Sequence, residues 1–342
     1  MRTVLVTGGA GFIGGHLVRQ LIDAQTYRVV VVDKLTYAGN LRSLESVWDS
    51  PRFSFLHSDI CDGPRMLDLL MQHHCDAVIN LAAETHVDRS IDSPAPFVQS
   101  NVVGTYELLE ATRSYLATLS DLQVDRFRFL QVSTDEVYGS LGKDGVFTES
   151  TSYSPNSPYS ASKAAADHFV RAYHQTYGLP TITTHGCNNY GPFQFPEKLI
   201  PLMIQRAVRG EPLPVYGNGK NVREWIHVED HCIALRLILE TGRVGQTYNV
   251  GSSTEKTNLE MVRAICDCVD RWTGRSHSSF DQIQWVADRP GHDFRYAIDA
   301  TKLKHELGWT PQIDFDNGID QTVKWYLDHP DWTESKTTPQ QA

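Results

Sequence analysis

Short apolar runs alternate with amphipathic stretches through the first half of the chain. Helical spacing of apolar positions predicts helices between these runs, over residues 12–22, 96–119 and 160–177. Continuous apolar strands separated by helices are typical of a parallel sheet covered on both faces. The pattern therefore predicts an α/β fold built on a doubly wound parallel sheet. Its predicted strands are Thr3–Thr7, Arg28–Val32, Arg52–Leu56, Asp76–Leu81, Phe127–Val132 and Thr181–Thr184.

The second half has a different pattern, because prolines divide it into short pieces. They are Pro192, Pro196, Pro201, Pro212 and Pro214. Shorter helices are predicted at 199–209, 228–240 and 258–273. We expect a first domain over 1–187 and a smaller α/β lobe, mainly 188–332, that closes over it and returns some chain to it. Residues 333–342 form a polar tail that we expect to be frayed.

Composition excludes several classes of protein. The 342 residues are 41% hydrophobic and 21% charged, with a net charge of -10, which argues against nucleic-acid or membrane partners. No apolar run approaches the ~20 residues that span a bilayer. The chain enters a strand by Thr3, so we expect no signal peptide. The six cysteines lack zinc spacing, which predicts no metal site and reduced thiols in the cytoplasm.

A glycine-rich turn follows the first strand. Gly8, Gly11 and Gly14 lie in GGAGFIG, between a strand and a helix. Such glycines let the backbone approach a pyrophosphate at the helix N-terminus, although the same turn also occurs without a ligand. Asp33 ends the second strand 19 residues beyond Gly14, where a carboxylate accepts ribose hydroxyls and repels a 2'-phosphate. A Rossmann-type site for NAD, rather than NADP, is predicted.

Polar side chains follow the fifth strand, where ligands meet a doubly wound sheet. Thr134, Asp135 and Glu136 lie in QVSTDEVYGS, and two adjacent acids suit a reaction that moves protons at neighbouring carbons, or simply a solvated loop. Tyr159 and Lys163 are four residues apart and share a helix face. The lysine charge is expected to lower the pKa of the phenol, so that tyrosine can act as a base.

Together, GGAGFIG, STDEVYG and YSASK resemble the extended short-chain dehydrogenase/reductase family. Five longer segments resemble its nucleotide-sugar 4,6-dehydratases, and the resemblance runs from Thr3 to about Tyr326. The segments are DKLTYAGNL (33–41), LAAETHVDRS (81–90), NNYGPFQFPEKLIP (188–201), VREWIHVEDH (222–231) and DRPGHDFRYAID (288–299).

The resemblance implies a lyase that oxidises carbon 4 of a nucleotide sugar, eliminates water across carbons 5 and 6, and returns the hydride to carbon 6. It favours dTDP-glucose as the substrate and implies that NAD is regenerated in each turnover. Tyr159, with Lys163, takes the proton of the 4-hydroxyl, which Thr134 holds. The resemblance assigns Asp135 as the acid for the leaving 6-hydroxyl and Glu136 as the base at carbon 5; the sequence alone does not order them.

The resemblance also implies two sets of ligand-binding residues. The cofactor set is Gly8, Gly11, Phe12, Ile13, Gly14, Asp33, Lys34, Thr36, Asp59, Ile60, Leu81, Ala82, Ala83, Thr85, Ser100, Tyr159, Lys163 and Asn189. The substrate set is Thr85, Thr134, Asp135, Glu136, Asn188, Lys198, Leu199, Pro214, Val215, Tyr216, Arg223, Asn258, Arg289 and His292. The guanidinium forks of the two arginines suit a diphosphate. His86 and Asp88 are expected on the cofactor side.

One stretch departs from the family pattern, because His185, Gly186 and Cys187 precede NNYGP where the family more often has other residues. A homodimer is also expected, through helices 96–119 and 160–177, whose apolar positions exceed what one layer needs. They are Val103, Tyr106, Leu109, Leu116, Ala166, Phe169, Val170 and Tyr173. Alternatives remain open: a dehydratase of another nucleotide sugar, a UDP-sugar 4-epimerase, or an idle NAD-binding regulatory protein. The choice between thymine and uracil, and the deoxysugar served, also stay open.

Overall fold

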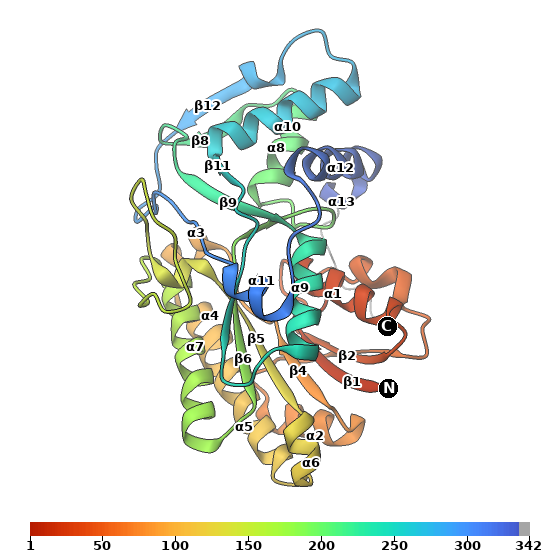
Figure 1. Ribbon diagram of the computed structural model, residues 1–342. Helices are drawn as coiled ribbons and strands as arrows, with labels where there is room; N and C mark the ends of the chain where they lie inside the picture. The colour runs from red at the N-terminus through yellow and green to blue at the C-terminus, as the bar shows by residue number, and fades with distance from the viewer. Residues whose placement is uncertain (335–342) are drawn as a thin grey trace.

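The computed structural model describes residues 1–334. Its main sheet has seven strands in the order β10-β6-β5-β4-β1-β2-β3, and every pair is parallel (Figure 1). The doubly wound parallel sheet predicted from the apolar runs is confirmed. Its strands are β1 (Arg2–Thr7), β2 (Tyr27–Asp33), β3 (Phe53–His57), β4 (Ala77–Asn80), β5 (Arg128–Thr134), β6 (Thr181–Gly186) and β10 (Thr247–Val250).

Alternation along the strands builds two cores, one on each face of this sheet. Val4 packs into one core and its neighbour Leu5 into the other. Helices α1 (Phe12–Asp23), α9 (Val228–Thr241) and α11 (Thr301–Leu307) cover the first face. Helices α2 (Gly63–His73), α5 (Gly104–Leu116) and α7 (Pro158–Tyr177) cover the second. Because α9 and β10 follow residue 187, the chain returns to the main sheet after leaving it.

A smaller lobe with its own core lies beyond the carboxyl ends of the main strands (Figure 1). One sheet contains β7 (Asn188–Tyr190), β9 (Val222–His227) and β11 (Glu255–Thr257), and the other contains β8 (Leu213–Tyr216) and β12 (Ile283–Val286). Its helices are α8 (Leu199–Arg209), α10 (Asn258–Thr273), α12 (Phe315–Asp328) and α13 (Pro330–Glu334). The predicted tail begins within α13, and its residues 335–342 lie outside the described part of the chain.

The helix expected over 96–119 is not uniform. It begins as α4 (Ala95–Phe97), passes through a π-helical segment, η2 (Val98–Val103), continues as α5, and is followed by the short α6 (Asp121–Arg126). Asn101 explains the irregularity, because its side chain accepts from the amide of Glu84 (2.8 Å) and donates to Ser162 Oγ (2.8 Å). π-Helical segments often occur at functional sites, and this one carries Ser100 and Asn101 towards the cofactor-binding loops.

Shorter helical segments complete the described chain: η1 (Leu41–Val47), α3 (Val87–Asp92), η3 (Asp135–Tyr138) and η4 (Ser279–Gln282). All six cysteines are unpaired thiols. Within residues 1–334, the helices are too short or too polar to cross a bilayer.

Candidate active site

A cavity of about 760 Å³ lies between the carboxyl ends of the main strands and the smaller lobe. Every residue predicted from the sequence as catalytic, cofactor-binding or substrate-binding lines it. The fold therefore brings together segments from both halves of the chain. The cavity is also lined by residues that sequence reasoning did not name, including Glu197, His231 and Tyr296.

The glycine turn forms one end of the cavity. Gly8 has a φ of +67°, and a Cβ there would lie 2.7 Å from the amide nitrogen of Ala82. A Cβ at Gly14 would lie 2.2 Å from the carbonyl oxygen of Gly8. Helix α1 begins at Phe12 directly after the turn, so its N-terminus faces the cavity. Only glycine permits this close packing of strand, turn and helix, which leaves the α1 amides accessible to an anion.

Asp33 lies beside this turn at the end of β2. Its carboxylate accepts from the amides of Ala10 (3.0 Å) and Leu35 (2.8 Å), which fixes its orientation towards the cavity. Burial raises the pKa of Asp33, and the two amide hydrogen bonds oppose that rise. Lys34 next to it donates to Ser100 Oγ in the π-helical segment and lies 3.6 Å from Asp59. These contacts join the three loops that form the predicted adenosine end.

The two adjacent acids lie at the end of β5, where η3 begins. Thr134 caps this turn, with its Oγ1 accepting from the amide of Glu136 (3.3 Å). Asp135 is 1% exposed, and its Oδ2 has no hydrogen-bond partner within the described chain. Burial raises the pKa of Asp135 well above its ordinary value, and the charges of Glu136 and Glu224 raise it further. Its surroundings thus favour the protonated form of Asp135.

Glu136 has different surroundings. Burial raises its pKa as well, but three cations oppose the rise: Arg289, Arg223 and Lys198. The two carboxyl groups therefore differ in the direction that an acid and a base require, since two acidic neighbours raise the pKa of Asp135 and three cations lower that of Glu136. The structure supplies this asymmetry, which the pattern of adjacent acids in the sequence does not contain.

Tyr159 and Lys163 lie in the first turns of α7, whose N-cap Ser157 forms a capping box with Ser160. The expected lowering of the Tyr159 pKa by Lys163 is wrong for the chain alone. Burial and the charge of Glu136 raise the pKa of Tyr159, and a hydrogen bond with Thr134 opposes them. The Lys163 ammonium instead donates to the carbonyl of Val132 (2.9 Å), which ties α7 to β5.

The other end of the cavity contains the basic residues predicted for a diphosphate. Arg223 is buried, donates to the carbonyl of Asp293 (3.0 Å), and stacks over Tyr296 with 4.3 Å between the guanidinium carbon and the ring centroid. Lys198 donates to the carbonyl of Thr85 (3.0 Å). Fixed guanidinium and ammonium groups at this end provide the positive charge that a diphosphate needs.

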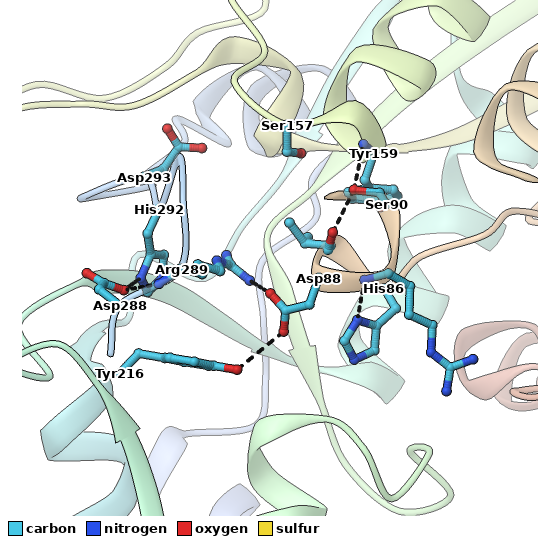
Figure 2. A network of polar contacts seen from close by, with 12 residues as sticks. His86, Asp88, Ser90, Ser157, Tyr159, Tyr216, Asp288, Arg289, His292 and Asp293 are labelled. Carbon is cyan, nitrogen blue, oxygen red and sulfur yellow. Dashed lines mark hydrogen bonds and ion pairs between the residues drawn. The ribbon is translucent and has the colours of Figure 1, made fainter. Parts of the chain in front are cut away.

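Figure 2 shows how Asp88 enters this end of the cavity. Its Oδ1 lies 3.5 Å from Arg289 Nη1, and its Oδ2 accepts from the hydroxyl of Tyr216 (3.4 Å). Asp88 thus contacts two predicted substrate ligands, and its expected place on the cofactor side is wrong. His292 is held by Asp288 (2.6 Å), and Ser90 accepts from the amide of Tyr159 (3.2 Å). The sequence offers no signal for the contacts of Asp88, since Tyr216 and Arg289 lie far from it in the chain.

The departure at residues 185–187 is explained by packing behind β5. The buried His185 ring contacts the hydroxyls of Tyr138 and Tyr153, each at 2.8 Å, and lies 3.3 Å from Asp167. A Cβ at Gly186 would lie 2.8 Å from His231, whose Nδ1 contacts Asn189 Oδ1 (2.8 Å). His185 thus supports the predicted nicotinamide end from behind, while Gly186 and Cys187 line the cavity.

These features define an enzyme of the dinucleotide-dependent nucleotide-sugar class. The family model for GDP-mannose 4,6-dehydratase matches residues 5–322, and the chain belongs to this family. It is 58% identical to a dTDP-glucose 4,6-dehydratase of Xanthomonas campestris pv. campestris, over 98% of this chain and 95% of the relative.

Solved structures give the same result. The dTDP-glucose 4,6-dehydratase DesIV of Streptomyces venezuelae, crystallised with NAD, matches with a TM-score of 0.89 and 45% identity, over 97% of this chain and 99% of that one. A UDP-glucose 4-epimerase of Thermotoga maritima, with UDP-glucose, matches with a TM-score of 0.83 and 28% identity, over 96% and 99%. The fold is common to both activities, while the sequence is much closer to the dehydratase.

Proposed function

We propose that the chain dehydrates dTDP-glucose to dTDP-4-keto-6-deoxyglucose, with NAD regenerated in each turnover. Similarity over almost the whole chain to relatives named for this reaction supports the proposal. The protein is an NAD-dependent hydro-lyase. The single observation that carries the reaction type is the pair Asp135 and Glu136. Asp135 is buried, with no hydrogen-bond partner for its Oδ2 in the described chain, and three cations lower the pKa of Glu136.

The residues of the cofactor end fit NAD. The N-terminus of α1 and the glycine turn would hold its pyrophosphate, and Asp33 would accept from the ribose hydroxyls. The same carboxylate would repel a 2'-phosphate, which favours NAD over NADP. The chemistry that NAD supplies when bound is reversible hydride transfer, away from carbon 4 and back to carbon 6.

Each acidic or hydroxyl group has one task in the proposed reaction. Tyr159 takes the proton of the 4-hydroxyl, and the adjacent Thr134 hydroxyl holds the 4-oxygen. Ketone formation at carbon 4 acidifies the proton on carbon 5, which Glu136 removes. Asp135, whose pKa burial raises, donates its proton to the 6-hydroxyl, which departs as water. Glu136 later returns its proton to carbon 5.

The experiment that tests this function compares two substrates. Purified protein is incubated separately with dTDP-glucose and UDP-glucose, and the products are analysed by mass spectrometry. Loss of one water from dTDP-glucose supports the proposal. Preferential loss of water from UDP-glucose would instead identify the substrate as a uridine nucleotide sugar. An unchanged mass with a new 4-epimer would favour the epimerase alternative, which needs no acid pair after β5.

We also infer that the chain forms a homodimer through α5 and α7. Of the eight apolar residues expected to exceed what one layer needs, five are buried within the chain: Leu109, Leu116, Ala166, Val170 and Tyr173. Val103 is half-buried. Tyr106 and Phe169 are 37% and 40% exposed, with their rings 6.3 Å apart. The nearby Val98 and Tyr177 are 52% and 56% exposed and extend this apolar face.

Light scattering tests the dimer. The parent chain should have about twice the 38.5 kDa of one copy, and Phe169→Arg should shift the mass to that of one copy by placing a charge on the apolar face. Leu122→Arg is the matched control, because Leu122 is 71% exposed but lies on α6. A parent mass of one chain would reject the dimer, and a dimeric Phe169→Arg variant would reject this face.

A further inference from the structure

Arg89 in α3 joins three segments that are distant in the sequence. Its Nη2 donates to Glu197 Oε2 (2.8 Å), in the loop before α8. Its guanidinium carbon lies 3.8 Å from the centroid of the Tyr37 ring, in the loop after β2. The Tyr37 ring in turn meets Phe195 edge-on, with 5.5 Å between centroids. One side chain therefore connects the main domain with the smaller lobe.

These three segments form one wall of the cavity. Thr36 and Ala38 flank Tyr37, Val87 and Asp88 precede Arg89, and all four line the cavity, as does Glu197 itself. The Arg89 side chain is 51% exposed, so it closes the wall from the solvent side. Because Thr36 and its neighbours Asp33 and Lys34 belong to the predicted cofactor end, the wall covers that end.

The contact is poorly suited to stabilising the fold. Ion pairs with an exposed partner contribute little to folding, because water screens them. The Glu197 carboxylate also carries a cost, since its Oε1 is buried without a hydrogen-bond partner in the described chain. The contact instead limits separation of the three segments, because their outward movement breaks the contacts of Arg89 with Glu197 and Tyr37.

We propose that Arg89, Glu197 and Tyr37 form a latch that retains NAD in the cavity. This inference rests on the proposed function, in which hydride taken from carbon 4 must return to carbon 6 within the same turnover. An enzyme that released its reduced cofactor midway would lose the hydride and stop. A latch on the outer wall prevents that loss without touching the reacting atoms.

The test measures release of bound NAD and needs no turnover. Protein loaded with radiolabelled NAD is mixed with excess unlabelled NAD, and the label retained on a filter is followed with time. Arg89→Ala, which removes the ion pair and the cation–π contact, should release NAD on the order of tenfold faster than the parent, and Glu197→Gln, which removes the ion pair alone, should speed release by a smaller factor. NAD binding should also become faster, because entry requires the same opening; loss of a direct NAD ligand would speed release alone.

Two further variants sharpen the result. Arg89→Ala combined with Glu197→Gln should release NAD no faster than the faster single variant, because each substitution removes the same Arg89–Glu197 ion pair. Arg243→Ala, which breaks the exposed pair with Glu306 away from the cavity, should leave release unchanged. Parent-like release in Arg89→Ala overturns the latch, as does faster release without faster binding. If Arg89→Ala does not fold, Glu197→Gln and Arg89→Lys decide. Absence of dehydration in a protein that still retains NAD would refute the proposed function and leave the latch intact.

Discussion

Replacing Glu136 by glutamine should separate oxidation from dehydration. Glutamine has nearly the same shape, so the change removes the carboxylate charge and basicity while keeping the side chain in place. Oxidation at carbon 4 depends on Tyr159, whose pKa is raised by the charge of Glu136. Removing that charge lowers the Tyr159 pKa, so proton removal from the 4-hydroxyl becomes easier.

The magnitude follows from the role of the lost group. A positioned general base is worth roughly 100- to 10,000-fold, which corresponds to about 3 to 5 kcal/mol of the barrier to removal of the carbon 5 proton. Arg289, Arg223 and Lys198 lose a negative neighbour, so the cavity becomes more positive. Binding of the diphosphate should therefore be unchanged or tighter, and the loss should appear in kcat.

The assay follows two signals in a single turnover. Absorbance of NADH should rise and persist after dTDP-glucose is added, while mass spectrometry shows almost no loss of water. Glu45→Gln, which changes an exposed carboxylate in η1, should behave as the parent. Parent-like dehydration by Glu136→Gln would refute the role of Glu136 as the base. Failure to accumulate NADH would show that Glu136 is needed for oxidation as well.

Three other predictions follow from the same geometry. Asp135→Asn should raise the melting temperature near neutral pH while abolishing dehydration. Burial raises the pKa of Asp135 in the folded state, so its carboxyl destabilises the fold above the unfolded pKa of about 4. Equal melting temperatures of the two proteins at neutral pH would contradict this. Arg223→Gln should move both limbs of the kcat profile to higher pH, since Arg223 lowers the pKa of Glu136 and Asp135; an unmoved profile would exclude this coupling. Denatured parent protein should release NAD, and Asp33→Ser should accept NADP where the parent does not; NADP bound to the parent would refute the role of Asp33.

Six of the seven strands of the main sheet could be predicted from the sequence, because strands such as β1, β2 and β4 are largely buried and apolar; β10 was not predicted. Helices α8 and α10 were also predicted with their observed bounds, since proline, glycine and capping residues mark their ends. Local signals of this kind depend only on neighbouring residues. The same holds for the glycine turn, whose sequence and φ requirement are local.

Features that depend on long-range contacts could not be predicted from the sequence. The π-helical segment arises because Asn101 bonds to Glu84 and Ser162, which no helical periodicity encodes. Ala166 and Phe169 both fit the apolar pattern of α7, yet Ala166 is fully buried and Phe169 is 40% exposed. The apolar pattern of α7 indicates two apolar sides but does not indicate which of them packs on the sheet. Asp88 was assigned to the wrong end of the cavity for the same reason.

The Tyr159–Lys163 pair shows a further limit. Spacing of four residues places both side chains on one face of α7, but it does not say where the ammonium bonds. Lys163 finds the carbonyl of Val132, and its pKa is itself lowered by burial. Two side chains can therefore share a helix face while a group on a neighbouring strand, here the carbonyl of Val132, determines where the ammonium bonds.

Binding and chemistry are coupled through the cations of this cavity. Arg223, Arg289 and Lys198 are the groups predicted to hold the diphosphate, and the same three lower the pKa of Glu136. In the free protein they oppose the rise that burial gives to the pKa of Glu136. A bound diphosphate offsets their charge, so the pKa of Glu136 rises and the carboxylate becomes a stronger base once substrate is present. Asp135 is affected less, because burial, rather than these cations, dominates its pKa. The arginines predicted to bind the nucleotide would therefore also restrain the base until the sugar is in place, which a surface cluster of positive charge would not do.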